Sequence, residues 1–277
     1  NTYSSCSSPK SFSGLSQGSH SLKIKQTDQA GNVSAISTAS WTIDSSAPAA
    51  VVLSGAPTGY TKSVSANISW STEANAISQC SVDAGAYASC TSPKSLASLQ
   101  DGIHSIAVKQ VDQAGNSSTP TTATWTVDTV TPSAPSLFGV PSGYSNLSTA
   151  SVSISGESGA SFQCALDNTT TYTACSNPYT LSGLADGAHY VSIKQTDQAG
   201  NQSEATTSAT WTVDTAAPSA PVLSGVPSGY TNNNSASISW TGESNATFSC
   251  SVDGGGFSGC PDTQVLVGLA DGSHSFR

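Results

Sequence analysis

Three rows of apolar positions in residues 45–128 alternate with polar positions in the period of two that is typical of half-buried strands. The rows are Val64, Ala66, Ile68 and Trp70; His104, Ile106 and Val108; and Ala123, Trp125 and Val127. A run at Val51–Ser54 also looks like a strand, and Ala56–Tyr60 reads as a turn. No stretch keeps a helical period. We therefore predict an all-β fold of about seven short strands, a β-sandwich.

The same pattern returns along the chain around a short signature, Lys-Gln-x-Asp-Gln-Ala-Gly-Asn. It stands at 25–32, 109–116 and 194–201, so its copies start 84 and 85 residues apart. A period of that length is too long for a solenoid unit and fits one small all-β domain. We therefore divide the chain into a partial repeat with the C-terminal strands only (1–44), two whole repeats (45–128 and 129–214), and a partial repeat with the N-terminal strands (215–277).

The cysteines follow the repeat too. They form three local pairs, Cys80/Cys90, Cys164/Cys175 and Cys250/Cys260. Regular local pairs in a chain rich in Ser and Thr predict disulfides in an oxidising compartment, whereas a zinc site needs tighter spacing and His partners. Cys6 aligns with the second member of each pair, so we expect its partner before residue 1.

Composition argues against binding to nucleic acid and against a membrane span, and it indicates that the chain is part of something longer. The formal charge is −9, with eight basic residues, whereas nucleic-acid binding needs a basic face. No apolar run approaches the roughly 20 residues that span a bilayer. The sequence has no Met and no signal peptide, so we expect it to be part of a longer chain or a processed product.

Candidate catalytic residues all recur with the repeat. The four histidines, His20, His104, His189 and His274, occupy one repeat position, just after an Asp-Gly or Gln-Gly turn. We interpret each as a packed ring that hydrogen-bonds nearby backbone. No nucleophile elbow or phosphate loop is present, and an active site is normally built once, so we predict no catalytic residues and no enzyme.

The strand that runs from Asp-Gly-x-His into the signature, followed by Trp-Thr-Val-Asp-Thr and a Pro-containing linker, resembles the bacterial immunoglobulin-like repeats of large secreted or surface adhesins and fibre proteins. The resemblance covers the whole chain. It implies tandem immunoglobulin-like β-sandwiches, each here with a local disulfide. That local pair departs from the inter-sheet disulfide of antibody domains.

The resemblance also implies that calcium could bind at the junctions between repeats. Several such repeats stiffen their junctions with Ca²⁺, which takes oxygen ligands. In immunoglobulin topology, carboxylates of one repeat would approach those of the next. The residues are Asp44 with Glu73, Asp112 and Asn116; Asp101 and Asp128 with Glu157, Asp197 and Asn201; and Asp186 and Asp214 with Glu243. The alternative is a self-sufficient turn in which Asp caps backbone amides and Gly supplies a positive φ. No cofactor is required in that case.

These observations predict a structural protein at the bacterial cell surface: a semi-rigid stalk or filament shaft whose linkers are stiffened by Pro. Its partners would be neighbouring repeats and, in a filament, other copies. Two alternatives stay open. One is a module that binds a host protein or glycan through its loops. The other is a subunit that assembles head to tail by strand addition.

Overall fold

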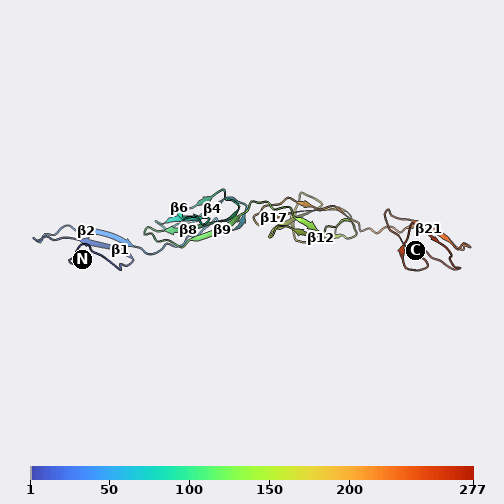
Figure 1. The fold of residues 1–277 in the computed structure, drawn as a ribbon, viewed down its shortest axis with the longest axis horizontal. Coiled ribbons are helices and arrows are strands. Elements are labelled where there is room, and N and C mark those ends of the chain that lie inside the picture. The colour runs from blue at the N-terminus through green and yellow to red at the C-terminus, as the bar shows by residue number, and fades with distance from the viewer. Residues whose placement is uncertain (1) are drawn as a thin grey trace. The chain divides into compact units, whose positions relative to one another are not determined.

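A computed structural model describes residues 2–277, and every regular element in that range is a β-strand (Figure 1). Repeat one contributes β1 (Gly18–Ile24) and β2 (Ser37–Ile43). Repeat two contributes β3 (Gly59–Thr61), β4 (Ala66–Ile68), β5 (Ile77–Val82), β6 (Ala88–Cys90), β7 (Lys94–Leu96), β8 (Gly102–Val111) and β9 (Thr121–Val127). The all-β class predicted from the sequence is confirmed.

The rest of the chain continues the pattern. Repeat three contributes β10 (Ser136–Phe138), β11 (Gly143–Ser145), β12 (Thr149–Ser155), β13 (Ser161–Leu166), β14 (Thr173–Cys175), β15 (Tyr179–Ser182), β16 (Gly187–His189), β17 (Val191–Thr196), β18 (Thr206–Thr207) and β19 (Trp211–Val213). Repeat four contributes β20 (Val222–Ser224), β21 (Ala236–Thr241), β22 (Ser249–Cys250), β23 (Ser258–Gly259) and β24 (Thr263–Leu266).

By its internal contacts the chain divides into two compact units. Unit one contains residues 1–139, 152–179 and 191–208, and unit two contains 140–151, 180–190 and 209–277. Unit one thus holds the first two repeats and part of the third. The repeat boundaries stay a prediction from the sequence, and each unit is described by itself.

Repeat two, within unit one, is a two-sheet sandwich. One sheet has the order β3-β9-β8-β5-β6, and the other pairs β4 with β7. Both sheets supply the core, in which Ile68, Ile106, Val108, Trp125 and Val127 are almost fully buried. These are the inward positions of the predicted alternation, so burial of one face per strand explains why the pattern folds into two layers.

The start of this repeat differs from the sequence prediction. Val51 is buried, but Val51–Ser54 forms no strand and contributes only an isolated bridge between Ser54 and Ser69. Conversely, Gly59–Thr61, at the end of the predicted turn, is the strand β3 and pairs in parallel with β9. Parallel pairing joins segments far apart in the chain, and no local alternation signals it.

In unit one the third repeat shows the sheet β14-β13-β17-β18, the counterpart of β6-β5-β8-β9. Unit two contains the sheet β11-β19-β16, in which β11 again pairs in parallel with β19. Repeat four, also in unit two, has the sheets β20-β21-β24 and β22-β23. They enclose a small core around Ala236, Ile238 and Trp240.

Each predicted cysteine pair forms a disulfide. Cys80–Cys90 and Cys164–Cys175 link strands that are adjacent in their sheets, and Cys250–Cys260 links β22 to the residue directly after the adjacent β23. Cys6 is exposed and pairs with none of the described residues. A disulfide that closes a loop of this length stabilises a small domain by about 3 kcal/mol in the chain-entropy account.

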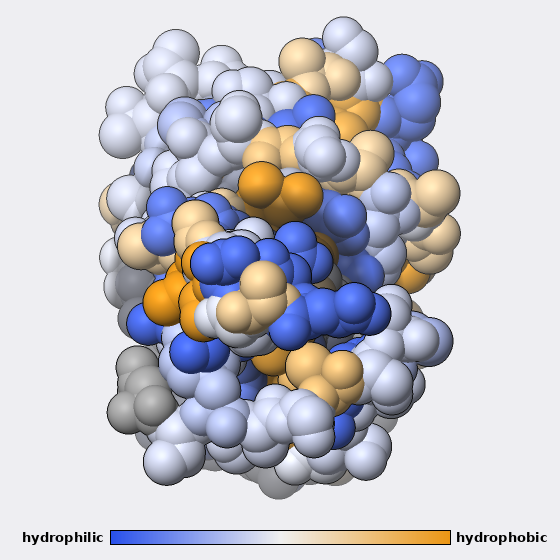
Figure 2. Space-filling view, turned by 90° about the vertical axis from the view of Figure 1, so that its left-hand side faces the viewer, coloured by the Kyte–Doolittle hydropathy of each residue, from blue (hydrophilic) through white to orange (hydrophobic). Residues whose placement is uncertain are grey.

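The outer surface is weakly polar. In the face drawn in Figure 2, pale residues near the middle of the hydropathy scale predominate and apolar areas are small and separate. Ser and Thr at outward strand positions account for this, as in β9, where Thr122 and Thr124 are exposed between inward residues. None of the described residues belongs to a helix that could cross a membrane.

Candidate functional site: the junctions between repeats

The signature folds into a closed turn after β8. The Asp112 carboxylate accepts the backbone N–H groups of Ala114 and Asn116 at 2.9 and 2.8 Å, and its second oxygen accepts the Asn116 side-chain amide at 2.9 Å. Gly115 has φ 91°, which favours glycine. The hydrogen bond from the Asn116 side chain is the main reason that the pKa of Asp112 lies below its usual value.

The same turn is built in the other two copies. Asn32 bonds both oxygens of Asp28 at 2.8 Å, and Asn201 bonds both oxygens of Asp197 at 2.8 Å. Burial works to raise the pKa of Asp197, but the bonds from Asn201 outweigh it and the pKa is lowered. The turn predicted from the sequence is therefore confirmed as self-capped.

The asparagine of this turn also reaches the preceding repeat. The Asn116 amide nitrogen donates to the backbone carbonyl of Asp44 at 3.0 Å, and that of Asn201 donates to the carbonyl of Asp128 at 2.8 Å. Asp44 and Asp128 are equivalent residues, the last of their repeats. One hydrogen bond thus recurs at both junctions that lie within unit one.

A glutamine at the second signature position holds the linker from inside. Gln110 donates to the carbonyl of Ala49 at 2.6 Å and accepts the backbone N–H of Glu73 at 2.7 Å. Gln195 does the same with Ser133 (2.7 Å) and with Glu157 (2.8 Å). Gln110 and Gln195 are only 3% and 1% exposed, so these bonds satisfy polar groups that water cannot reach.

The exits of repeats two and three are each fastened by an Asp-Gly turn. Asp101 accepts the backbone N–H and the hydroxyl of Thr129, both at 2.9 Å, just after the end of repeat two. Asp186 makes the same pair of bonds to Thr215 at 3.0 and 2.8 Å. The Thr215 backbone N–H, followed by its hydroxyl, lowers the pKa of Asp186.

Junction one lacks this carboxylate and uses an amide instead. Gln17, in the position of Asp101, accepts the Ser45 N–H at 2.9 Å and donates to the Asp44 carboxylate at 2.9 Å. One contact is specific to the second junction: Lys62 donates to the carbonyl of Gly200, in the signature turn of the next repeat, at 3.1 Å.

The predicted calcium ligands are only partly brought together. Asn116 donates to the Asp44 carbonyl and Asn201 to that of Asp128, while Asp112 and Asp197 accept N–H groups of their own turns. The carboxylates of Asp44, Asp128 and Asp214 accept backbone N–H groups of their own linkers. Glu73, Glu157 and Glu243 are exposed. Residues 2–277 contain no grouping of three or more His, Cys, Asp or Glu side chains that could hold a metal ion.

The structure does not supply a ready calcium cage. The carboxylate oxygens of Asp112 and Asp197 already accept N–H donors of their own turns, and Ca²⁺ needs those lone pairs. The hard oxygen ligands are present in the sequence, but their described contacts are those of the turn. Calcium stays a prediction.

All four histidines make the backbone hydrogen bond that the sequence predicted. The Nε2 of each lies 2.7–2.8 Å from a backbone carbonyl four residues earlier, those of Ser16, Gln100, Ala185 and Ala270. His20, His104 and His189 also lie 5.9–6.2 Å from the ring of the β-strand tryptophan beside them, Trp41, Trp125 and Trp211. These three are packed rings on a strand, as in a tyrosine corner, whereas His274 is exposed and lies outside the strands.

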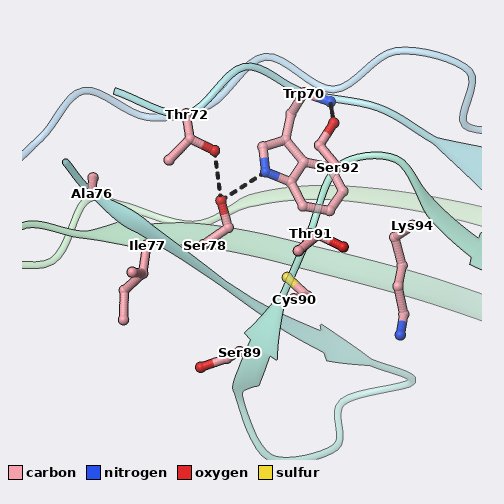
Figure 3. Close-up of a pocket in the computed structure, with 10 residues that line it drawn as sticks. All are labelled: Trp70, Thr72, Ala76, Ile77, Ser78, Ser89, Cys90, Thr91, Ser92 and Lys94. Atoms are coloured by element: carbon pink, nitrogen blue, oxygen red, sulfur yellow. Dashed lines mark hydrogen bonds between the residues drawn. The ribbon is translucent and has the colours of Figure 1, made fainter. Parts of the chain in front are cut away.

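An open groove lies at the edge of the second repeat (Figure 3). Trp70 forms one wall, and its indole N–H donates to the Ser78 hydroxyl at 2.8 Å. Thr72 bonds the same hydroxyl at 2.9 Å, while Ser92 accepts the Trp70 backbone N–H at 2.8 Å. These polar groups satisfy one another, so the groove is a feature of packing at this edge.

Residues 56–129 match the family model for a bacterial Ig-like domain. The match covers most of the second repeat. Among solved structures, 159 chains match. They include fibronectin(III)-like modules of Clostridium thermocellum CbhA, with 15% identity, 59% of this chain and 93% of that chain covered, and a TM-score of 0.36. Among curated proteins, none matches this sequence. The immunoglobulin-like fold predicted from the sequence is confirmed, and such a fold is typically non-catalytic.

Sequence reasoning missed two roles. The first is that of Gln110 and Gln195, which lie next in the inward alternation after the apolar residues of β8 and β17. A polar side chain facing inward at a strand end predicts a buried hydrogen-bond partner. The second is Asp83, which contacts His104 at 2.9 Å. No local pattern joins these two residues, because they are cross-strand neighbours.

Proposed function

We propose that this chain is a semi-rigid extracellular spacer, the stalk or filament shaft of a bacterial surface adhesin or fibre. Its immunoglobulin-like repeats would hold another part of the protein away from the cell. The observation that carries the proposal is the hydrogen bond from the signature asparagine to the last residue of the preceding repeat, present at both junctions of unit one.

Three further features support a load-bearing role. The first two linkers are each bonded on both sides, by the exit amide or carboxylate of one repeat and by the buried glutamine of the next. Each of the last three repeats has a disulfide that limits how far it can extend. Finally, a weakly charged surface rich in Ser and Thr suits an exposed shaft that needs no specific ligand.

Stretching single molecules tests the load-bearing role. Pulled by its ends, the oxidised chain should unfold in discrete steps, one for each whole repeat. Reduction should lengthen each step by about 30 Å, because each disulfide spans 10 or 11 residues at roughly 3.5 Å per extended residue and already bridges 5.8–5.9 Å between its Cα atoms. Featureless extension of the oxidised chain at low force would contradict a load-bearing spacer.

Calcium at the junctions is a separate hypothesis within this function. If Ca²⁺ stiffens the linkers, calorimetric titration of residues 45–214 should release or absorb heat, and scattering in calcium and in chelator should differ. Asp112→Asn and Asp197→Asn variants should then lose that heat. No heat and no change of shape would leave the hydrogen-bonded junction as the whole account. Direct host or glycan binding and head-to-tail assembly stay predictions, since no contact favours them.

A further inference from the structure

His104 lies between two hydrogen-bond acceptors. Its Nδ1 is 2.9 Å from a carboxylate oxygen of Asp83, and its Nε2 is 2.7 Å from the carbonyl oxygen of Gln100. A carboxylate and a carbonyl can only accept, so both ring nitrogens must donate to satisfy this arrangement. A neutral imidazole carries one N–H, whereas an imidazolium carries two.

The arrangement is repeated in unit two. His274 Nδ1 is 2.8 Å from an Asp253 oxygen, and its Nε2 is 2.8 Å from the carbonyl of Ala270. In both repeats the other carboxylate oxygen accepts the backbone N–H of the residue after the histidine, Ser105 or Ser275, at 2.8 Å. Two independent copies of one geometry argue for a built feature.

The carboxylate is held in an unusual backbone conformation. Asp83 and Asp253 have φ of 50° and 51°, in the left-handed region that L-residues other than Gly, Asn and Asp rarely adopt. Each residue opens the turn between the two strands joined by the disulfide, β5–β6 or β22–β23. The bonds to histidine and to serine fix the aspartate in this conformation.

In repeat two the histidine joins three parts of the domain. Asp83 belongs to the disulfide hairpin, His104 belongs to β8, and Gln100 belongs to the turn before β8. The next residue in that turn, Asp101, holds Thr129 of the linker. The ring therefore lies between the disulfide hairpin and the turn that fastens the exit of the repeat.

We propose that in repeats two and four a protonated histidine clamps the disulfide hairpin to the turn before its strand, and that loss of its proton at higher pH loosens this end of the repeat. The device is a pH-sensitive fastening built into the sandwich. It does not depend on the chain's role as a spacer.

The surroundings of the ring support a charged state. The charged group in contact with His104 is Asp83, while β9 presents the uncharged ring of Trp125 at 6.2 Å and the preceding turn presents a carbonyl. The Gln100 carbonyl and then Asp83 raise the pKa of His104. Burial works to raise the pKa of Asp83, but the N–H of Ser105 and His104 outweigh it and the pKa is lowered.

These directions define the pH window. A histidine whose pKa is raised by folding contributes stability that is full below its unfolded value of about 6.5 and is lost as pH rises through the folded value. An aspartate whose pKa is lowered contributes stability that is lost as pH falls below about 3.8. The fastening is therefore strongest in mildly acidic conditions and weakens as pH rises through the raised pKa of the histidine.

Nitrogen NMR of the full chain tests the proposal directly. Near pH 6.5, both ring nitrogens of His104 and His274 should show the shifts of protonated imidazolium. Asp83→Asn should lower the titration midpoint of His104, because it removes an opposite charge that favours the imidazolium, and leave that of His274 unchanged. Asp253→Asn should do the reverse, so each variant is the control for the other.

Amide exchange tests the loosening itself. Exchange at Asp83, Ser105 and Thr129 should speed up between pH 6 and pH 9 beyond the intrinsic rise, and His104→Gln, which keeps a polar side chain of similar length, should remove this extra change. A His104 midpoint at or below 6.5 that Asp83→Asn does not move would overturn the proposal. If the His104 midpoint shifts but amide exchange shows no extra rise with pH, the histidine forms only a static ion pair, and the proposed pH-sensitive fastening is overturned.

Discussion

The second and third repeats bind their linkers through the same glutamine hydrogen bonds, but they fill one corner of their cores with different side chains. Gln110 and Gln195 make the same two bonds, to the linker and to the residue before a turn. In the corner beneath that turn, repeat two places Thr72 and Ser78 against Trp70. Repeat three places Gly156 and Phe162 at the aligned positions.

The glycine and the phenylalanine of repeat three belong together. A Cβ at Gly156 would lie 2.9 Å from the Phe162 ring and would clash with the Gln195 side-chain oxygen. Repeat four has the same pair, because a Cβ at Gly242 would lie 2.8 Å from the Phe248 ring. In repeat two a hydroxyl bonded to the Trp70 indole takes the place of the ring, and the open groove of Figure 3 lies there.

The difference shows where the fold tolerates change. A core corner needs volume and satisfied polar groups, and several combinations supply both. A junction needs particular donors at particular carbonyls, and few side chains can replace a glutamine that bonds two backbone groups. The bonds that fix these two repeats to their linkers are therefore kept while this corner of the core varies.

We expect the largest effect from removing the glutamine hydrogen bonds that the two repeats share. Gln110→Ala and Gln195→Ala each remove a buried side chain and leave a backbone N–H and a carbonyl without the partners of two part-buried hydrogen bonds, at a cost of about 1–3 kcal/mol for each group. We expect each variant to lose roughly 3 kcal/mol, measured by native-state hydrogen exchange in β8 or β17. Losses that differ by more than about 1.5 kcal/mol between the repeats would show that the shared bonds are not equivalent.

The next prediction exchanges the two corners. Phe162→Ser removes a half-buried ring and should cost repeat three about 2–3 kcal/mol. Ser78→Phe alone should destabilise repeat two by about 1–3 kcal/mol, because Thr72 occupies the space that glycine leaves open in repeat three. The double variant Thr72→Gly with Ser78→Phe should recover most of that loss. Failure to recover would disprove that the two corners are alternative packings.

We expect a smaller effect at the turns between the disulfide-bonded strands, where repeats two and four have different residues at positive φ. Ala84 has φ 58° where repeat four has Gly254 with φ 75°. Alanine is strained in that region and glycine is not. We expect Ala84→Gly to raise the unfolding free energy of repeat two by about 0.5–1 kcal/mol in denaturant titrations. Gly254→Ala should lower that of repeat four by a similar amount; effects of the opposite sign would contradict the strain.

We expect the smallest effect when low pH protonates the aspartates that cap the signature turns. Bonds from Asn116 and Asn201 lower the pKa values of Asp112 and Asp197, so these carboxylates stabilise the folded state above their ordinary value of 3.8 and lose that effect as pH falls through the folded values. The signature turns should therefore open below about pH 4, seen as faster amide exchange at Asn116 and Asn201. Turns that open equally in Asp112→Asn and in the unmodified chain would argue against the carboxylate caps.

Much of this architecture could be predicted from the sequence because it is local or periodic. The alternation around Ile106 and Trp125, the cysteine pairs and the self-capped Asp112 turn all follow from residues close in the chain. The parallel strand at Gly59–Thr61 and the Asp83–His104 contact could not, since both join distant segments. The junction prediction placed Asp44 near Asn116, but the contact uses the Asp44 backbone carbonyl and leaves its carboxylate with the linker.

Residual dipolar couplings test the central claim most directly. In the unmodified chain, amides of residues 45–128 and of residues 152–179 and 191–208 should fit one alignment tensor, because Asn201 and Gln195 fix the linker between them. Asn201→Ala should separate them into two tensors, while Asn32→Ala, whose described side-chain bond stays within its own turn, should not. Two tensors in the unmodified chain, or no change in Asn201→Ala, would contradict a junction held by the signature turn.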